Sequence, residues 1–137
     1  MKIYFAGAIR GGRDDVQLYL ELVELLQAYG TVLTEHVADE QLTSLGESND
    51  DRAIHDRDLA WLKEADCLVA EVTTPSLGVG FEIGKATEWG KRVLGLFRPS
   101  SGRTLSALIA GSDRVTVREY KDASQVKKIF EEFFAAS

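Results

Sequence analysis

The stretch Glu71-Val-Thr-Thr-Pro-Ser-Leu-Gly-Val-Gly-Phe-Glu-Ile-Gly84 joins two contrasting patterns and indicates how the chain folds. The apolar run Cys67-Leu-Val-Ala70 before it is typical of a buried strand. After the loop, a helix is predicted over residues 80–89, with Trp89-Gly90 as a suitable end. A buried strand that leads through a glycine-containing loop into a helix is the repeating unit of an α/β protein.

The rest of the chain repeats this alternation of strand and helix. Further strands are predicted at residues 2–6, 31–34, 92–97 and 114–119. Further helices are predicted from Asp14 or Asp15 to Gly30, and over residues 51–64, 104–110 and 123–135. The sequence therefore predicts a single domain over residues 1–137, with a three-layer α/β fold. Its five-stranded, mostly parallel sheet should carry helices on both faces.

Composition narrows the classes of function. The net charge of −6 argues against a protein that tracks a nucleic-acid polymer, because such binding needs a basic surface. No stretch is long and apolar enough to span a membrane, and no signal peptide is visible, so we expect no membrane partner. The single cysteine, Cys67, excludes an internal disulfide and is compatible with a cytoplasmic protein, or also a nuclear one in a eukaryote.

Ligands of such sheets bind beyond the carboxyl ends of the strands, where the loops 7–13, 34–50, 72–80 and 98–103 should meet. In the third loop, Ser76, Gly78 and Gly80 precede a helix N-terminus, which is an anion-binding arrangement. Glu82 follows about one turn into that helix, and the helix dipole is expected to keep its carboxylate ionised. An ionised carboxylate beside a phosphate suits attack on a sugar carbon; the alternative is an ordinary acidic residue of a first turn.

The first loop, Gly7-Ala-Ile-Arg-Gly-Gly-Arg13, contains three glycines and two arginines. It lacks the G-x-G-x-x-G spacing of a dinucleotide site, so we reject a nicotinamide cofactor. Contact with a phosphate or a sugar is the functional interpretation, and a tight turn with solvated arginines is the alternative. In the second loop, His36 follows a strand and could contact a ligand, but no histidine has a partner at metal-ligand spacing.

Asp58 interrupts an otherwise apolar helical face, whose other members are Ile54, Trp61, Leu62 and Ala65. A carboxylate there costs free energy unless it is paired or functional. Asp58 and Glu82 could therefore be two carboxyl groups that face one cleft, one as nucleophile and one as acid. The alternative is a structural ion pair, for example with Arg10 or Arg13.

Five segments together resemble a known family. They are Tyr4-Phe-Ala-Gly-Ala-Ile-Arg-Gly-Gly-Arg13, Gly30-Thr-Val-Leu-Thr-Glu-His36, His55-Asp-Arg-Asp-Leu-Ala-Trp-Leu62, Ala70-Glu-Val-Thr-Thr-Pro-Ser-Leu-Gly-Val-Gly-Phe-Glu82 and Leu96-Phe-Arg-Pro-Ser-Ser-Gly-Arg-Thr-Leu-Ser106. They resemble the 2′-deoxynucleoside 5′-monophosphate N-glycosidases of the nucleoside 2-deoxyribosyltransferase superfamily. The resemblance runs from Tyr4 to about Ile109 and implies a flavodoxin-like (Rossmann-like) fold, a homodimer, and no metal or organic cofactor. It also implies cleavage of the bond between C1′ of a deoxyribose 5-phosphate and the base.

Carried onto this chain, the resemblance assigns Glu82 as the nucleophile that forms a covalent deoxyribosyl intermediate. It assigns Asp58 as the acid for the departing base and Tyr4 as the tyrosine beside the glutamate. Ser106 would reach the phosphate bound by the neighbouring subunit. The remaining matches are binding residues: Ile9, Arg10, Gly11, Gly12 and Arg13 in the first loop, and Ser76, Gly78 and Gly80 in the phosphate loop. One departure is Ala8, where relatives often carry serine.

Two other functions remain open from the sequence. A deoxyribosyltransferase would use the same carboxylates but pass the sugar to a second base, and it should not prefer a 5′-phosphate. A non-catalytic nucleotide-binding module would bind without turnover, but it leaves Asp58 on its apolar face unexplained.

Overall fold

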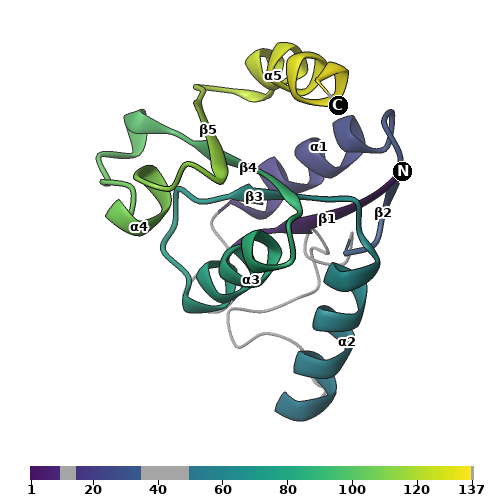
Figure 1. The fold of residues 1–137 in the computed structure, drawn as a ribbon. Coiled ribbons are helices and arrows are strands. Elements are labelled where there is room, and N and C mark those ends of the chain that lie inside the picture. Colours follow the sequence, from purple (N-terminus) through teal and green to yellow (C-terminus); the bar gives the residue numbers. More distant parts are fainter. Residues whose placement is uncertain (10–14, 35–49, 137) are drawn as a thin grey trace.

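A single parallel sheet organises the part of the chain that the computed structural model describes, which is residues 1–9, 15–34 and 50–136 (Figure 1). Its strands lie in the order β2-β1-β3-β4-β5, and every neighbouring pair is parallel. This is the flavodoxin-like order, so the predicted parallel sheet is confirmed. The strands are β1 Lys2–Ala6, β2 Thr31–Val32, β3 Cys67–Glu71, β4 Arg92–Phe97 and β5 Val115–Glu119.

Helices cover both faces of the sheet, which confirms the predicted three layers. Helices α1 (Val16–Leu26) and α5 (Ala123–Ala135) pack side by side on one face. Helices α2 (Asp51–Glu64) and α3 (Leu77–Glu88) pack on the other, together with the short helix α4 (Ala107–Ala110). At 14 residues, α2 is the longest helix of the described chain, and no described helix has the length and hydrophobicity to cross a bilayer.

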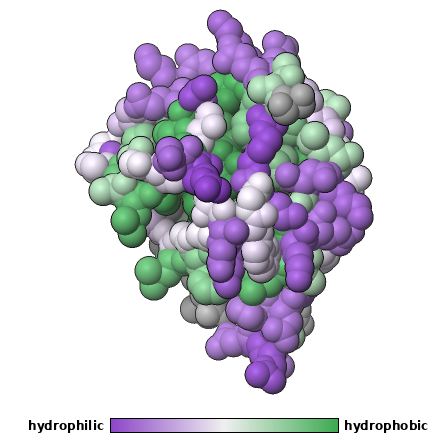
Figure 2. Space-filling model, in the orientation of Figure 1, coloured by the Kyte–Doolittle hydropathy of each residue, from purple (hydrophilic) through white to green (hydrophobic). Residues whose placement is uncertain are grey.

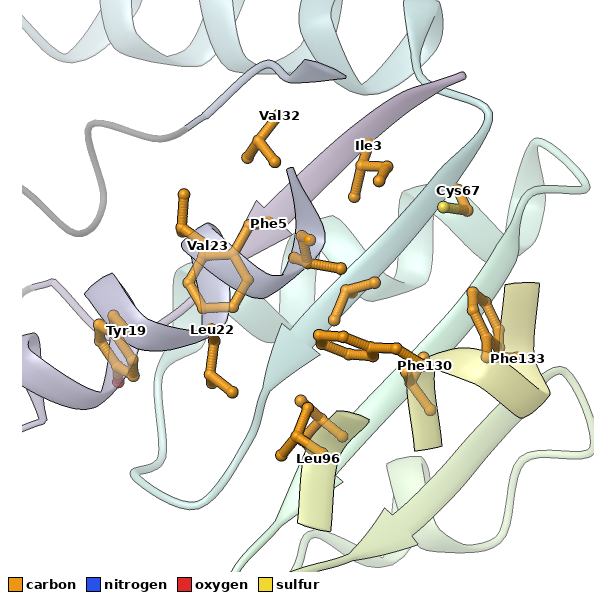
Figure 3. Packing of buried hydrophobic residues seen from close by; sticks show 14 of the residues in the cluster. Ile3, Phe5, Tyr19, Leu22, Val23, Val32, Cys67, Leu96, Phe130 and Phe133 are labelled. Atoms are coloured by element: carbon orange, nitrogen blue, oxygen red, sulfur yellow. The ribbon is translucent and has the colours of Figure 1, made fainter. Parts of the chain in front are cut away.

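The two faces of the sheet follow from the alternation of side chains along each strand. On β1, Ile3 and Phe5 point toward α1 and α5, whereas Tyr4 and Ala6 point toward α2 and α3. Figure 3 shows the first of these cores, where Phe130 and the other apolar residues of α5 meet the sheet. All five residues of β3 are buried, because helices cover this central strand on both sides.

Some predicted boundaries were wrong. Helix α3 begins at Leu77 and not at residue 80, because the Ser76 hydroxyl accepts a hydrogen bond from the Val79 N–H at 3.2 Å and caps the helix there. This cap outweighs the low helix propensity of the glycines that follow. The other differences are mostly shorter elements: α1 ends at Leu26 and leads through turns at residues 27–29 to Gly30, β2 ends at Val32, α4 begins at Ala107 and β5 begins at Val115. In addition, a 3-10 helix, η2, occupies Pro99–Ser101 within the predicted 98–103 loop.

Candidate active site

Tyr4, Asp58 and Glu82 meet on the α2–α3 side of the sheet. The Tyr4 side chain rises from the centre of β1 with its hydroxyl donating a hydrogen bond to Oε2 of Glu82 on α3. Burial raises the pKa of Tyr4, and the negative charges of Glu82 and Asp58 raise it further. The phenol therefore stays protonated and remains a hydrogen-bond donor. The structure thus brings together the three residues that the sequence singled out for catalysis.

The environment of Glu82 favours its protonated form more than expected. Burial of the carboxyl group raises its pKa from 4.5 to about 7; the hydrogen bond from Tyr4 acts in the opposite direction, and the charge of Asp58 raises it further. The helix dipole was expected to keep Glu82 ionised, but burial outweighs it and places the pKa of Glu82 near neutral pH. Glu82 is the sixth residue of α3, and the dipole effect falls off within the first turn, whereas desolvation does not.

Asp58 has a partner that the sequence analysis did not propose. Its Oδ1 lies 2.9 Å from Nη2 and 3.0 Å from Nε of Arg57, and the Arg57 guanidinium lies 4.8 Å from the centre of the Trp61 ring. Only 22% of the Asp58 side chain is exposed. The predicted partners, Arg10 and Arg13, lie outside the described residues. Neighbours in sequence point about 100° apart on a helix, so the helical pattern gave no signal for the pair of Asp58 with Arg57.

The N-terminus of α3 provides the expected anion-binding arrangement. Ser76 is the N-cap residue, and the N–H groups of Leu77 and Gly78 are among those that a helix leaves without an internal partner. Gly78 and Gly80 lie within the first turn of the helix and not in the loop before it. A Cβ placed on Gly80 meets no described atom within 4 Å, so packing among the described residues does not explain this glycine. Close approach of a ligand to the backbone would explain it.

The first loop is described only in part. A Cβ on Gly7 would lie 2.9 Å from the Tyr19 ring, so this glycine is required by packing whatever else it does. Ile9 packs against the core of α1 and α5. The remaining predicted binding residues of this part of the chain lie outside the described residues: Arg10, Gly11, Gly12, Arg13 and His36.

Ser106 lies at the start of α4, exposed to solvent, and its side chain makes no capping hydrogen bond. Leu108, two residues further along on α4, is 90% exposed. In Figure 2, hydrophobic atoms gather on the side of α4, whereas the projecting end of α2 is hydrophilic. The hydroxyl of Ser106 is therefore presented outward, beside apolar groups.

A buried polar network lies beside the predicted site and was missed by the sequence analysis. Its centre is Glu71, the last residue of β3, which is fully buried and forms an ion pair with Arg98. Glu71 appeared in the sequence only as the end of an apolar strand. The available signal was a charged residue at the end of a strand expected to be buried on both faces, because such a residue requires a partner.

As for metals, the described residues contain no cluster of three or more His, Cys, Asp or Glu side chains that could hold an ion.

Comparison with known proteins identifies the family of this chain. The family model for nucleoside 2-deoxyribosyltransferases matches residues 3–131. The chain belongs to this family. Its relatives include proteins named 5-hydroxymethyl-dUMP N-hydrolase. The protein of this name from Danio rerio is 54% identical, over 98% of this chain and 96% of the relative. The one from Homo sapiens is 50% identical, over 98% of this chain and 79% of the relative.

Solved structures with a similar fold are more distant in sequence. A CMP N-glycosidase from Clostridium botulinum superposes with a TM-score of 0.70 at 17% identity, covering 97% of this chain and 99% of that one. A 2-deoxyribosyltransferase from Bacillus psychrosaccharolyticus gives 0.69 at 18% identity, covering 93% and 90%. At identities of 17% and 18%, these similarities show the fold of the present chain and nothing further.

Proposed function

We propose that this protein hydrolyses the N-glycosidic bond of 2′-deoxynucleoside 5′-monophosphates and releases the free base and 2-deoxyribose 5-phosphate. The observation that carries the proposal is the meeting of Glu82, Tyr4 and Asp58 next to the N-terminus of α3. The close relatives named 5-hydroxymethyl-dUMP N-hydrolase support the same substrate class.

The reaction would proceed in two steps. First, a carboxylate oxygen of Glu82 bonds to C1′ as the bond from C1′ to the base breaks; the electron pair leaves with the base, which takes a proton from Asp58. Second, water attacks C1′, the bond to Glu82 breaks, and Asp58 accepts the proton of the water. The Tyr4 hydroxyl holds the Glu82 carboxylate in position through its hydrogen bond.

The raised pKa of Glu82 suits this role. A carboxylate that burial makes less stable is a better nucleophile than a fully solvated one, while a pKa of about 7 still leaves a large ionised fraction near neutral pH. Positive charge develops at C1′ in the transition state, so the desolvated carboxylate gains stabilisation as the bond forms. A 2′-hydroxyl would crowd this centre and withdraw electrons from it, which agrees with a preference for deoxyribose.

The phosphate would be bound at the start of α3 by Ser76, by the N–H groups of Leu77 and Gly78, and by the first loop, and the lack of a side chain at Gly80 would let it approach the backbone closely. Binding energy from this remote group can orient C1′ against Glu82. The substrate should therefore lose most of its reactivity when the 5′-phosphate is removed.

The direct test is to incubate the protein with each deoxynucleoside monophosphate, including 5-hydroxymethyl-dUMP, and to measure free base by chromatography. The matching nucleosides and ribonucleotides are the controls, and we expect base only from the phosphorylated deoxy compounds. Equal turnover of nucleoside and nucleotide would refute the proposal. Formation of a new nucleotide when a second base is added would favour the deoxyribosyltransferase, and binding without turnover would favour a nucleotide-binding module.

The roles of the two carboxyl groups can be separated by substitution. Glu82→Ala should lose nearly all turnover and still bind the nucleotide, because the phosphate contacts lie elsewhere. Asp58→Asn should slow cleavage most for bases that must be protonated to leave. Glu88→Ala, on the exposed part of the same helix, is the matched control and should be fully active. Substantial turnover by Glu82→Ala would exclude a covalent route through this residue.

We further propose that two chains share each site, with Ser106 reaching the phosphate bound by its neighbour. The exposed Ser106 and the exposed Leu108 on the same short helix support this arrangement, which a two-fold dimer would repeat in both sites. Mixing Glu82→Ala chains with Ser106→Ala chains tests it. A heterodimer would then hold one site with both defects and one with neither, so mixing should restore activity. Activity that only averages the two parents, after verified exchange of subunits, would show that each chain completes its own site.

A further inference from the structure

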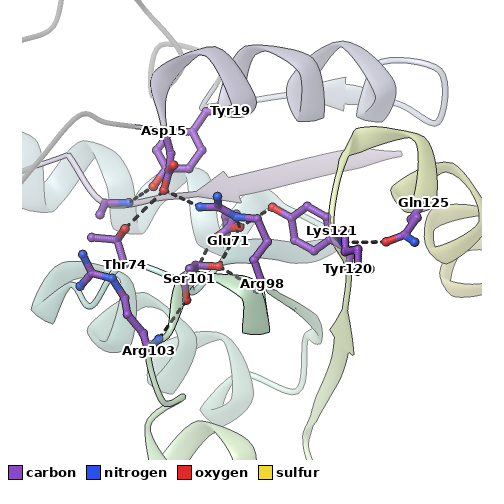
Figure 4. A network of polar contacts seen from close by, with 12 residues as sticks. Asp15, Tyr19, Glu71, Thr74, Arg98, Ser101, Arg103, Tyr120, Lys121 and Gln125 are labelled. Atoms are coloured by element: carbon purple, nitrogen blue, oxygen red, sulfur yellow. Dashed lines mark hydrogen bonds and ion pairs between the residues drawn. The ribbon is translucent and has the colours of Figure 1, made fainter.

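Glu71 is a buried carboxylate that the proposed reaction does not use. It ends β3 with no solvent exposure, and its two oxygens accept four hydrogen bonds. Figure 4 shows Arg98 and Tyr120 directed toward Glu71. Oε1 accepts from the Thr73 N–H at 2.7 Å, and Oε2 accepts from the Thr73 hydroxyl at 3.0 Å, from Nε of Arg98 at 3.2 Å and from the Tyr120 hydroxyl. Glu71 is thus bound by three residues that follow the ends of three neighbouring strands, β3, β4 and β5.

Arg98 connects the network to Asp15, the residue before α1. Its Nη2 donates to Oδ2 of Asp15 at 2.6 Å, so one guanidinium joins two carboxylates. Burial alone would lower the pKa of Arg98, but Glu71 and Asp15 outweigh it and raise the pKa, which keeps the charge in place. Asp15 precedes α1 without capping it, because its carboxylate is directed toward Arg98 and toward the Thr74 hydroxyl at 3.3 Å.

These bonds converge on the short segment that leads into α3. The Thr73 hydroxyl donates to Glu71 and accepts from the Arg98 N–H at 3.0 Å, and the Thr74 hydroxyl contacts Asp15. Only Pro75 separates this segment from Ser76, the cap of the helix. The polar contacts of residues 73 and 74 therefore determine where the N-terminus of α3 lies relative to the sheet.

Stability alone is a weak explanation for such a network. A buried ion pair is often no more stabilising than apolar side chains of the same volume, because both charges must leave water. A fully satisfied polar network does, however, define one geometry, and a displacement of an ångström at a binding loop can cost much of its function.

We propose that Glu71 and Thr73 are positioning residues that hold the start of α3 in the geometry needed to bind the 5′-phosphate group. This inference rests on the proposed function for its choice of ligand. Neither residue is assigned a contact with the substrate: they act through the segment 73–75 on Ser76 and on the first N–H groups of the helix.

The test compares Thr73→Val with Thr73→Ser. Valine has nearly the shape of threonine but lacks the hydroxyl that joins Glu71 to the Arg98 backbone, whereas serine retains it. Loss of a hydrogen bond to a charged group should weaken binding of 2-deoxyribose 5-phosphate, measured by calorimetry, about tenfold or more. Thr73→Ser should bind within about threefold of the wild type, since it keeps the network. Thr74→Val removes only the weaker contact to Asp15 and should show a smaller loss of affinity in the same direction.

Kinetics provide the measurement that a purely structural role would not change. The KM for the deoxynucleotide should rise in Thr73→Val while kcat changes little. The kcat/KM for the nucleotide should fall about tenfold through this rise in KM, and KM does not depend on the fraction of the enzyme that is folded. Val126→Ala, in the core on the opposite face of the sheet, is a control that reduces stability and should leave KM unchanged.

The two proposals fail in different ways. If the wild type hydrolyses deoxynucleotides and Thr73→Val keeps its affinity for 2-deoxyribose 5-phosphate, the positioning role is wrong and the proposed function stands. If the wild type binds this ligand without turning over nucleotides, and Thr73→Val but not Thr73→Ser loses the binding, the positioning role stands and the hydrolysis is wrong. Equal losses in both variants would also overturn the inference, because the hydroxyl would then not matter.

Discussion

Replacing the catalytic candidate Glu82 by glutamine should make the protein more stable, and more so at high pH. In the folded protein the pKa of Glu82 is raised to about 7, chiefly by burial, from an ordinary value of 4.5. The folded state therefore holds a proton that the unfolded chain has already released between these two values. Stability contributed by this residue is present below about pH 4.5 and is lost as the pH rises through about 7.

The size of the effect follows from the two pKa values. At about 1.4 kcal/mol for each pKa unit, Glu82 destabilises the fold by about 3 kcal/mol at pH 8.5 and by about 1 kcal/mol at pH 5.5. These are upper values, because the residue is only partly buried and water screens its charge. Glutamine has no charge to desolvate and can still accept the hydrogen bond from Tyr4. Glu82→Gln should therefore gain up to about 2 kcal/mol more over the wild type at pH 8.5 than at pH 5.5.

Urea unfolding followed by circular dichroism at the two pH values measures this difference. Glu88→Gln removes a carboxylate from the same helix where the side chain is 65% exposed, and it should change stability by no more than a few tenths of a kcal/mol at either pH. A Glu82→Gln protein that is no more stable than the wild type at pH 8.5 would refute the reasoning. So would a gain of equal size at both pH values, since it could not come from titration of the carboxyl group.

Three further outcomes are expected from the same structure. The pH profile of kcat/KM should rise with an apparent pKa near 7 as Glu82 ionises; Tyr4→Phe should move this rise to higher pH, because it removes the hydrogen bond that lowers the pKa of Glu82, and an unmoved profile would contradict the coupling. Phe130→Ala, which empties the centre of the core between α1, α5 and the sheet, should lower the free energy of unfolding by about 3–5 kcal/mol in urea titrations, and a loss under about 1 kcal/mol would show that the core collapses around the gap. Gly30→Ala should also be destabilising, because its Cβ would overlap the Met1 carbonyl oxygen; an unchanged midpoint in thermal unfolding would show that the first residue of the chain can move aside.

The order of strands and helices could be predicted because it depends on local patterns. The apolar run of β3 and the alternation along β1 each reflect which faces of the sheet are covered, and the structure confirms both. The start of α3 was misplaced by three residues because Gly78 and Gly80 resemble a loop in sequence. The cap formed by Ser76 decides that boundary, and its strength relative to glycine propensity is known only once the hydrogen bond is seen.

The candidate site could likewise be predicted from the sequence only in part. Side-chain chemistry and family motifs were sufficient to single out Tyr4, Asp58 and Glu82, and the structure brings them together. The pair of Asp58 with Arg57 was not predicted, since helical spacing favours partners three or four residues apart.

The sequence by itself determined the parallel α/β architecture, the acidic residues available for catalysis and the helix N-terminus available for a phosphate. Only the tertiary structure decided how these groups behave. The hydrogen bond from Tyr4 to Glu82 joins positions 78 residues apart, and the bond from Arg98 to Asp15 joins positions 83 residues apart. Burial of Glu82 and of Glu71 likewise results from packing between distant elements. The free energy of a charge depends on its solvation and its neighbours in space, which local sequence patterns do not contain, and for this reason the pKa of Glu82 and the role of Glu71 emerged only from the fold.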